Sequence, residues 1–226
     1  MFAINHAATA LLVKRRYPAV PMVAALLSVQ LVELIWVALH YAGIERTVVD
    51  PVVRSVGDIH LVHMPYSHSV ATTILLAALA WGIGWMTGRR TLGAALALGI
   101  ASHLVLDLAT HDRDIAIAPF TNLPEIGTML YAAAPGIAFV LELAWGIFCW
   151  RVYRGSVGLL TAIALFNLAN VSMFFAAIPG PEQWFANQPM LLVTAILVQI
   201  VVTLAVVGVL ARSRNVSVAA ADAPAQ

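Results

Sequence analysis

Apolar residues dominate this chain in long, nearly unbroken runs. Six of these runs lie at about 19–42, 68–88, 91–111, 130–154, 157–180 and 188–211. A helix needs roughly 20 residues to cross a hydrocarbon core of about 30 Å, so each run predicts a transmembrane span. A shorter apolar stretch at 2–13 would cover only ~18 Å as a helix. We expect it to enter the membrane part-way or to lie at the interface.

The composition supports a membrane protein. Hydrophobic residues make up 62% of the chain and charged residues 10%, with a mean hydropathy of +0.90, whereas soluble domains carry roughly 25% charged residues. We therefore predict an all-α polytopic helical bundle of about six transmembrane helices plus the short N-terminal helix. A single membrane domain covers 1–212, and the tail 213–226 is expected to be disordered. The net charge of +1 gives no reason to expect a nucleic-acid partner.

The positions of the basic residues predict the orientation. Nine of the twelve flank the spans on one side: Lys14, Arg15, Arg16, Arg89, Arg90, Arg151, Arg154, Arg212 and Arg214. Because basic residues concentrate on the cytoplasmic side, this side is expected to face the cytoplasm, together with the C-terminus. The loops 43–67, 112–129 and 181–187 then face outward.

Several ionisable residues interrupt the apolar runs. An ionisable group at the centre of a span costs about 2.5–3.5 kcal/mol on insertion scales and usually indicates function. Glu33, His103 and Asp107 lie ~18–24 Å above the inner ends of their predicted helices, at one level in the outer half of the membrane. His103, Asp107 and His111 follow at i, i+4 and i+8, which places them on one helix face.

This pattern is typical of a metal site. Two neutral imidazoles and one or two carboxylates, with a position left for water, form the usual first shell of a catalytic zinc ion. An ion would also neutralise carboxylates otherwise stranded in hydrocarbon. His68 opens the second span within "PYSHS", where Ser67 and Ser69 are expected to orient it or to cap the helix. Ser67 is the predicted N-cap.

Each polar residue also has a purely structural explanation. Glu33 and the His103–Asp107 pair would then only hold helices together, and Glu142 would be a protonated structural acid. His40 and His60, at the outer interface, are expected to be solvated. The amides in the last two spans are expected to form interhelical hydrogen bonds; they are Asn167, Asn170 and Gln199.

The order of the motifs resembles a known family. An N-terminal histidine in "NHAATALLV", an acid in "LVELIW", "PYSHS" at the second span and "SHLVLD" in the third are followed by "HDRD". This order is similar to that of the bacterial membrane-bound metal-dependent hydrolases related to YdjM, a LexA-regulated inner-membrane protein, and closest to a divergent branch of them. The wider family carries an acidic pair where this chain has Glu33 alone. The similarity covers about 1–150, the site-bearing part.

The resemblance implies a site and a location. The metal ligands it implies are His6, Glu33, His68, His103 and Asp107, and the ion would be divalent, with zinc first and manganese or iron as alternatives. Glu33 would be a further ligand or the general base, while His111 or Asp114 would contact the head group or relay protons. The protein would then be a hydrolase of the bacterial inner membrane. The depth of the site predicts a membrane lipid or lipid-linked ester as its substrate.

Two other functions fit parts of the same pattern. A proton or metal-ion transporter would use Glu33, Asp107, Glu142 and the histidines as a path, and would need ionisable groups through the full membrane thickness. A non-catalytic membrane scaffold would use the polar cluster only to lock its helices together. Metal content, transport into liposomes and the effect of neutral substitutions distinguish the three.

Overall fold

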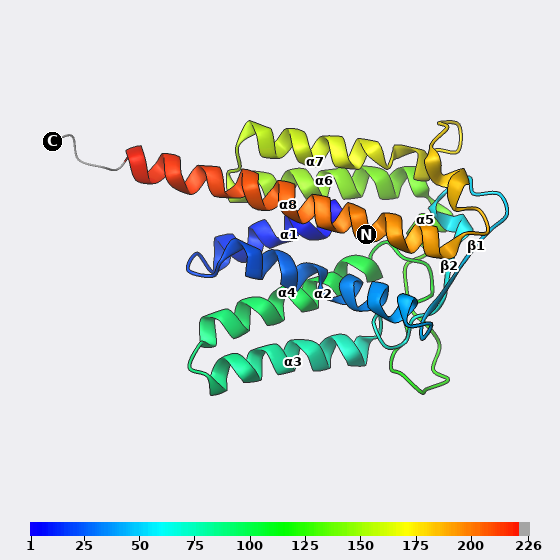
Figure 1. Cartoon of the computed structure of the whole chain (residues 1–226), viewed down its shortest axis with the longest axis horizontal. Coiled ribbons are helices and arrows are strands. Elements are labelled where there is room, and N and C mark those ends of the chain that lie inside the picture. The colour runs from blue at the N-terminus through cyan, green and yellow to red at the C-terminus, as the bar shows by residue number, and fades with distance from the viewer. Residues whose placement is uncertain (222–226) are drawn as a thin grey trace.

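The computed structural model describes residues 1–221, and these are predominantly helical. Its α-helices are α1 (Ala3–Arg16), α2 (Met22–Tyr41), α3 (Val70–Met86), α4 (Arg90–Leu108), α5 (Leu130–Ala133), α6 (Pro135–Tyr153), α7 (Val157–Ala169) and α8 (Pro189–Ala221). Apart from the one-turn α5, these helices run roughly along the long axis of the molecule (Figure 1). The prediction of a membrane helical bundle is confirmed in outline, with a small sheet in addition.

Four of the helices are long and apolar enough to cross a membrane. They are Met22–Tyr41, Arg90–Leu108, Pro135–Tyr153 and, within α8, Pro189–Ala211. Helices α3 and α7 also lie where spans were predicted, but they contain 17 and 13 residues. Six spans therefore remain a prediction. Helix α8 extends to Ala221, nine residues into the predicted tail, and 222–226 lie outside the described residues.

Helix α7 ends well before the predicted limit at residue 180. Its last residue is Ala169, and a short 3-10 helix, η2 (Val171–Met173), follows. The Asn170 side chain donates to the carbonyl of Phe166 at 2.7 Å. Side-chain bonds of this kind compete with continued helix, and the prolines at 179 and 181 exclude further regular helix downstream.

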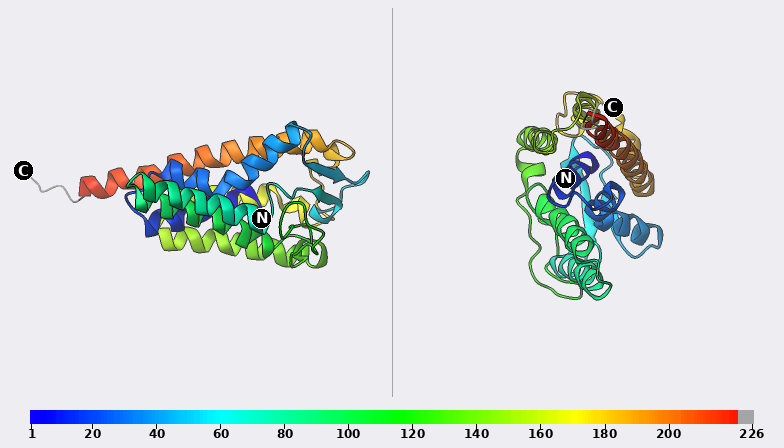
Figure 2. Two further views of the ribbon diagram at one scale, coloured as in Figure 1. Left: turned by 90° about the horizontal axis from the view of Figure 1, so that it is seen from below. Right: turned by 90° about the vertical axis from the view of Figure 1, so that its left-hand side faces the viewer.

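Helix α1 lies inside the bundle, which corrects the prediction of an interfacial or partly inserted segment. Ten of its 14 residues are buried, and it contacts α2, α4, α6, α7 and α8. Figure 2 shows it surrounded by the other helices when the molecule is viewed along its length. Ala7, Ala8 and Ala10 are completely buried, and such small residues let neighbouring backbones approach closely.

Glycines set the spacing of the helices that carry the ionisable residues. A Cβ added to Gly99 in α4 would lie 2.0 Å from the Ser28 Oγ of α2. Likewise, a Cβ on Gly93 of α4 would lie 2.8 Å from the Cα of Gly84 in α3. Helix α4 is thus packed tightly between α2 and α3, and its polar face is held against both.

The loops predicted to face outward gather at one end of the bundle (Figure 1). This end contains an antiparallel hairpin that the sequence did not predict, formed by β1 (Arg46–Val49) and β2 (Ile59–His63), with the 3-10 helix η1 (Val56–Asp58) between them. The 112–129 loop joins the start of α3 through two bonds, from Val70 N–H to the Ala116 carbonyl and from Ala71 N–H to the Ile117 carbonyl.

Candidate metal centre

The five predicted metal ligands meet in space. His6 comes from α1, Glu33 from α2, His68 from the turn before α3, and His103 and Asp107 from α4. Four of these residues are 3% exposed or less, whereas the Glu33 side chain is 23% exposed. Two overlapping triads are spaced to hold an ion: His6, His103 and Asp107, and Glu33, His68 and His103.

Ligand atoms of four residues lie close together, and they belong to the two triads that share His103. The Glu33 Oε2 lies 3.0 Å from His68 Nε2 and 3.7 Å from His103 Nε2. Across from it, Asp107 Oδ2 lies 3.0 Å from His103 Nε2 and 3.8 Å from His68 Nε2. Ligands of a tetrahedral ion with bonds of about 2.0–2.1 Å are themselves ~3.3 Å apart. The four separations bracket that value, and each of the two triads is spaced so that it could hold a small divalent ion.

Hydrogen bonds to the Nδ1 atoms of His68 and His103 fix the tautomers of these two rings. The His103 Nδ1 lies 2.7 Å from the Val29 carbonyl, which can only accept, so Nδ1 carries the hydrogen. Ser67 Oγ donates to Glu45 Oε2 at 2.6 Å and therefore accepts from His68 Nδ1 at 2.8 Å. In the neutral rings both Nε2 atoms then carry a lone pair, as metal-binding histidines require.

Three buried atoms of the candidate ligands have no hydrogen-bond partner: His6 Nδ1, His103 Nε2 and Asp107 Oδ2. The His103 Nε2 and the Asp107 Oδ2 are fully buried, and although 3.0 Å apart they do not form a hydrogen bond. Buried polar groups are normally satisfied, and a lone pair facing a carboxylate oxygen is repulsive unless a proton or cation lies between them. This pair of orphaned atoms is what an absent cation would leave.

The two serines beside His68 have different roles. Ser67 orients the ring, as predicted, and its partner Glu45 also accepts the backbone N–H groups of Tyr66 and Ser67. Ser69 is the N-cap of α3 and accepts from the Thr72 N–H, which corrects the prediction of Ser67 in that role. The sequence did not predict the role of Glu45, because an acidic residue just beyond a span is expected to be exposed to solvent. In the structure Glu45 is only 2% exposed.

The second oxygen of Asp107 faces a different group of residues. Its Oδ1 lies 3.1 Å from His6 Nε2, 3.6 Å from His111 Nε2 and 2.6 Å from the Met1 amino nitrogen. The His6 ring also stacks on that of His103, with centroids 3.9 Å apart. His111 therefore lies at the edge of the centre, and its Nδ1 is 3.4 Å from Asp114.

A buried hydrogen-bond network holds α1 in place beside the centre. Glu142 of α6 accepts from the Phe2 N–H at 2.9 Å, from Asn5 at 2.7 Å and from the Tyr131 hydroxyl at 2.5 Å. Asn5 also donates to Asn167 of α7. The interhelical role predicted for the amides is confirmed for Asn167, as it is for Gln199, which donates to Asn170.

The remaining histidines lie away from the centre. His40 is 5% exposed and bonds to the Trp36 carbonyl and to Thr47, so its predicted solvation is wrong. His40 is covered by residues that follow α2 in the chain, among them Thr47 of β1. His60 is exposed and pairs with Asp50 at 3.3 Å, while His63 is exposed on β2.

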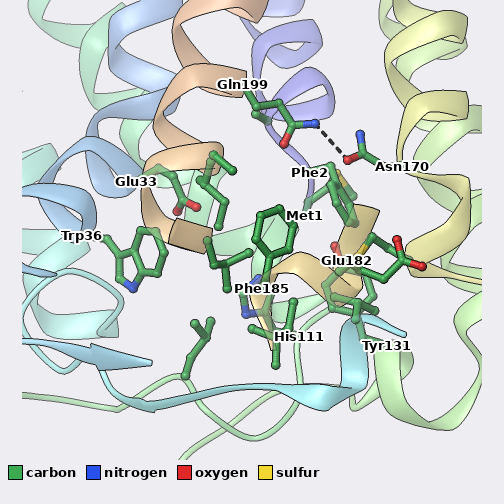
Figure 3. A pocket seen from close by; sticks show the side chains of 18 of the residues that line it. Met1, Phe2, Glu33, Trp36, His111, Tyr131, Asn170, Glu182, Phe185 and Gln199 are labelled. Atoms are coloured by element: carbon green, nitrogen blue, oxygen red, sulfur yellow. Dashed lines mark hydrogen bonds between the residues drawn. The ribbon is translucent and has the colours of Figure 1, made fainter. Parts of the chain in front are cut away.

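A cavity of about 300 Å³ adjoins the centre. Its wall includes His6, Glu33, His68 and His111, together with residues from η2, α8 and the 3-10 helix η3 (Pro181–Phe185). Figure 3 shows Glu33 and His111 in this cavity. The volume falls at the lower end of the ~300–1,000 Å³ typical of small-molecule sites.

No protein-family model, curated protein or solved structure matches this chain. The fold and site together define a helical protein, with four helices able to cross a membrane, that carries a buried histidine–carboxylate centre beside a cavity. The resemblance suggested by the motifs remains a prediction.

Proposed function

We propose that this protein is a metal-dependent hydrolase acting within a membrane on a lipid or lipid-linked ester. His6, Glu33, His68, His103 and Asp107 would hold a divalent ion, zinc first, with manganese or iron as alternatives. The observation that carries the proposal is the orphaned pair of buried atoms, His103 Nε2 and Asp107 Oδ2, at the convergence of the ligands.

The residues around the centre support hydrolysis. A bound divalent ion polarises an ester or phosphoryl oxygen and lowers the pKa of water towards ~7. Glu33, the most exposed acid of the centre, would be a further ligand of the ion or the general base that accepts a proton from water. His111, whose Nδ1 lies 3.4 Å from Asp114 Oδ1, would pass a proton to a leaving group.

The surroundings of the cavity support a lipid as substrate. The cavity lies among helices apolar enough to span a membrane, and a water-soluble substrate would not need to enter there. On the positive-inside rule the centre lies toward the outer face and the C-terminus in the cytoplasm. With the resemblance of the motifs, this favours the bacterial inner membrane.

The distribution of polar residues does not favour transport. The hydrophobic cluster around the second half of α1 and the start of α2 is built from apolar side chains such as Leu11, Val13, Val20 and Met22. Leu11 and Val13 lie along α1 between His6 and the basic residues Lys14, Arg15 and Arg16. A path for ions would need polar groups at that depth.

The first test is the metal content of the detergent-purified protein, measured by mass spectrometry. We expect about one zinc, manganese or iron ion per chain in the wild type and in His60→Ala, whose histidine is exposed. His103→Ala should lose the ion, because it removes a ligand from the middle of both triads. No metal in the wild type after reconstitution with each ion would refute the proposal and leave the cluster as a structural lock.

A further inference from the structure

A buried carboxylate lies in the same cavity, away from the metal centre. Glu182, in η3, is 4% exposed and lines the cavity. Its Oε2 accepts from Ser172 Oγ at 2.8 Å. Figure 3 shows Glu33 and Glu182 on opposite sides of the cavity, with Met1 and Phe185 between them in this view.

No basic side chain compensates Glu182. Among the described residues, no lysine, arginine or histidine lies within ion-pair distance of it, and none of the described residues lining the cavity is a lysine or arginine. An ion at the centre would neutralise Glu33 and Asp107 but not a carboxylate across the cavity. A buried carboxylate with a hydroxyl partner but no counter-charge is unfavourable, so a cation is the group that would complement this wall.

The neighbouring side chains fit an organic cation. Phe185 and Tyr131 line the same cavity as Glu182, and aromatic faces attract ammonium groups, most strongly when both are desolvated. Close packing also keeps the carboxylate in place, since a Cβ on Gly180 would meet Ser172 Oγ at 2.0 Å and Glu182 Oε2 at 2.2 Å.

We propose that the Glu182 wall is a subsite for an ammonium group, so that the substrate is a zwitterionic ester, anionic at the metal centre and cationic at Glu182. This rests on the proposed function, because the anionic part needs the ion. The sequence places Glu182 in a predicted outer loop, 181–187. An ammonium-bearing lipid head group would lie at that depth, with its acyl chains toward the apolar helices.

The test is calorimetric titration of the zinc-loaded, detergent-purified protein with O-phosphoethanolamine and with glycerol 3-phosphate, which lacks the ammonium. We expect wild type to bind phosphoethanolamine about tenfold more tightly or better, as for a hydrogen bond between charged groups. Glu182→Gln should abolish this preference with unchanged metal content. Glu125→Gln, which neutralises an exposed acid of another loop, should keep it.

A second titration separates this proposal from the metal centre. Chelator-treated protein is titrated with hexylammonium and with 1-hexanol, and the preference for the ammonium should fall in Glu182→Gln. If no variant binds metal but this difference persists, the hydrolase proposal fails and the ammonium subsite stands. If Glu182→Gln does not fold, Glu182→Asp withdraws the carboxylate by one methylene and should weaken the preference.

A purely structural Glu182 gives a different result. Ser172→Ala removes the hydroxyl that bonds to Glu182 but leaves the carboxylate, so the ammonium preference should survive in it. Equal losses of thermal stability in Ser172→Ala and Glu182→Gln, with the same ammonium preference as wild type in both, would overturn the subsite. No ammonium preference in wild type would overturn it as well.

Discussion

At the scale of residues, the centre depends on groups that are not ligands themselves but hold the ligands in place. His68 and His103 present Nε2 to the same position because a serine and a carbonyl, respectively, occupy their Nδ1 atoms. Outer partners of this kind fix the tautomer and the direction of a metal-binding histidine. The two serines of the Ser-His-Ser sequence have separate roles. Ser67 orients the His68 ring, and Ser69 caps the N-terminus of α3.

Ser67→Ala is expected to weaken metal binding while leaving all the ligands in place. The variant loses the hydroxyl that links His68 to Glu45, so the ring is free to rotate and to change tautomer. Loss of such a partner typically lowers metal affinity about ten- to a hundredfold, which competition with a chromogenic chelator would measure.

The matched control is Ser69→Ala, on the other side of the same histidine. It removes the N-cap of α3 and should lower stability by about 1 kcal/mol with metal affinity near that of wild type. Equal metal affinities in the two variants would show that Ser67 does not position His68.

At the scale of elements, close helix packing assembles the centre. The i, i+4 spacing places His103 and Asp107 on one face of α4, but Glu33 reaches them only because α2 lies against α4 at Gly99. Helix α1 adds His6, and the hydrogen bonds of Glu142 to Phe2 and Asn5 hold it there.

Gly99→Ala is expected to separate α2 from α4. The new Cβ would lie 2.0 Å from Ser28 Oγ and 2.8 Å from Ser28 Cβ, so turning the hydroxyl away does not relieve the overlap. Overpacking of this kind costs about 1–3 kcal/mol, and the shift moves Glu33 away from His103. Thermal unfolding in detergent and metal content should both fall.

Gly82→Ala is the control for the same change in a helix. No atom lies within 4 Å of a Cβ added to Gly82 in α3. Alanine favours helix over glycine by about 1 kcal/mol, so this variant should be as stable as wild type or more stable, with full metal content. A normal metal content in Gly99→Ala would contradict the role of the α2–α4 contact.

At the scale of the whole molecule, the centre and its cavity lie near the end where the loops and the hairpin gather, and the C-terminal end of α8 extends from the other end (Figure 1). This asymmetry gives the orientation in the membrane a functional meaning. On the proposed function, it decides from which side a lipid head group would reach the cavity.

Labelling of introduced cysteines tests this orientation. Asn122→Cys, in the loop at the cavity end, should react with a membrane-impermeant maleimide on intact bacterial cells, because the basic residues at the other end are retained inside. Thr87→Cys, in the turn between α3 and α4, should react only after permeabilisation. Both positions are exposed, and the native Cys149 is buried, so the wild-type protein serves as the unlabelled control. The reverse pattern would place the cavity toward the cytoplasm.

The sequence by itself determined the class of protein and most of the candidate centre. Helix positions follow from the length of apolar runs, which depends only on local composition. The pairing of His103 with Asp107 follows from helical periodicity. The predicted ligands stand out because placing an ionisable group in an apolar run costs free energy, whichever neighbours the helix packs against.

The tertiary structure alone decided what depends on distant contacts. An alanine-rich helix such as α1 looks interfacial until five other helices surround it, and Met1 and Asp107 meet although 106 positions separate them. Glu45, Glu182 and His40 look solvated in the sequence, because burial of a loop or helix-end residue depends on what packs over it. The hairpin likewise arises from strand pairing that no apolar pattern records.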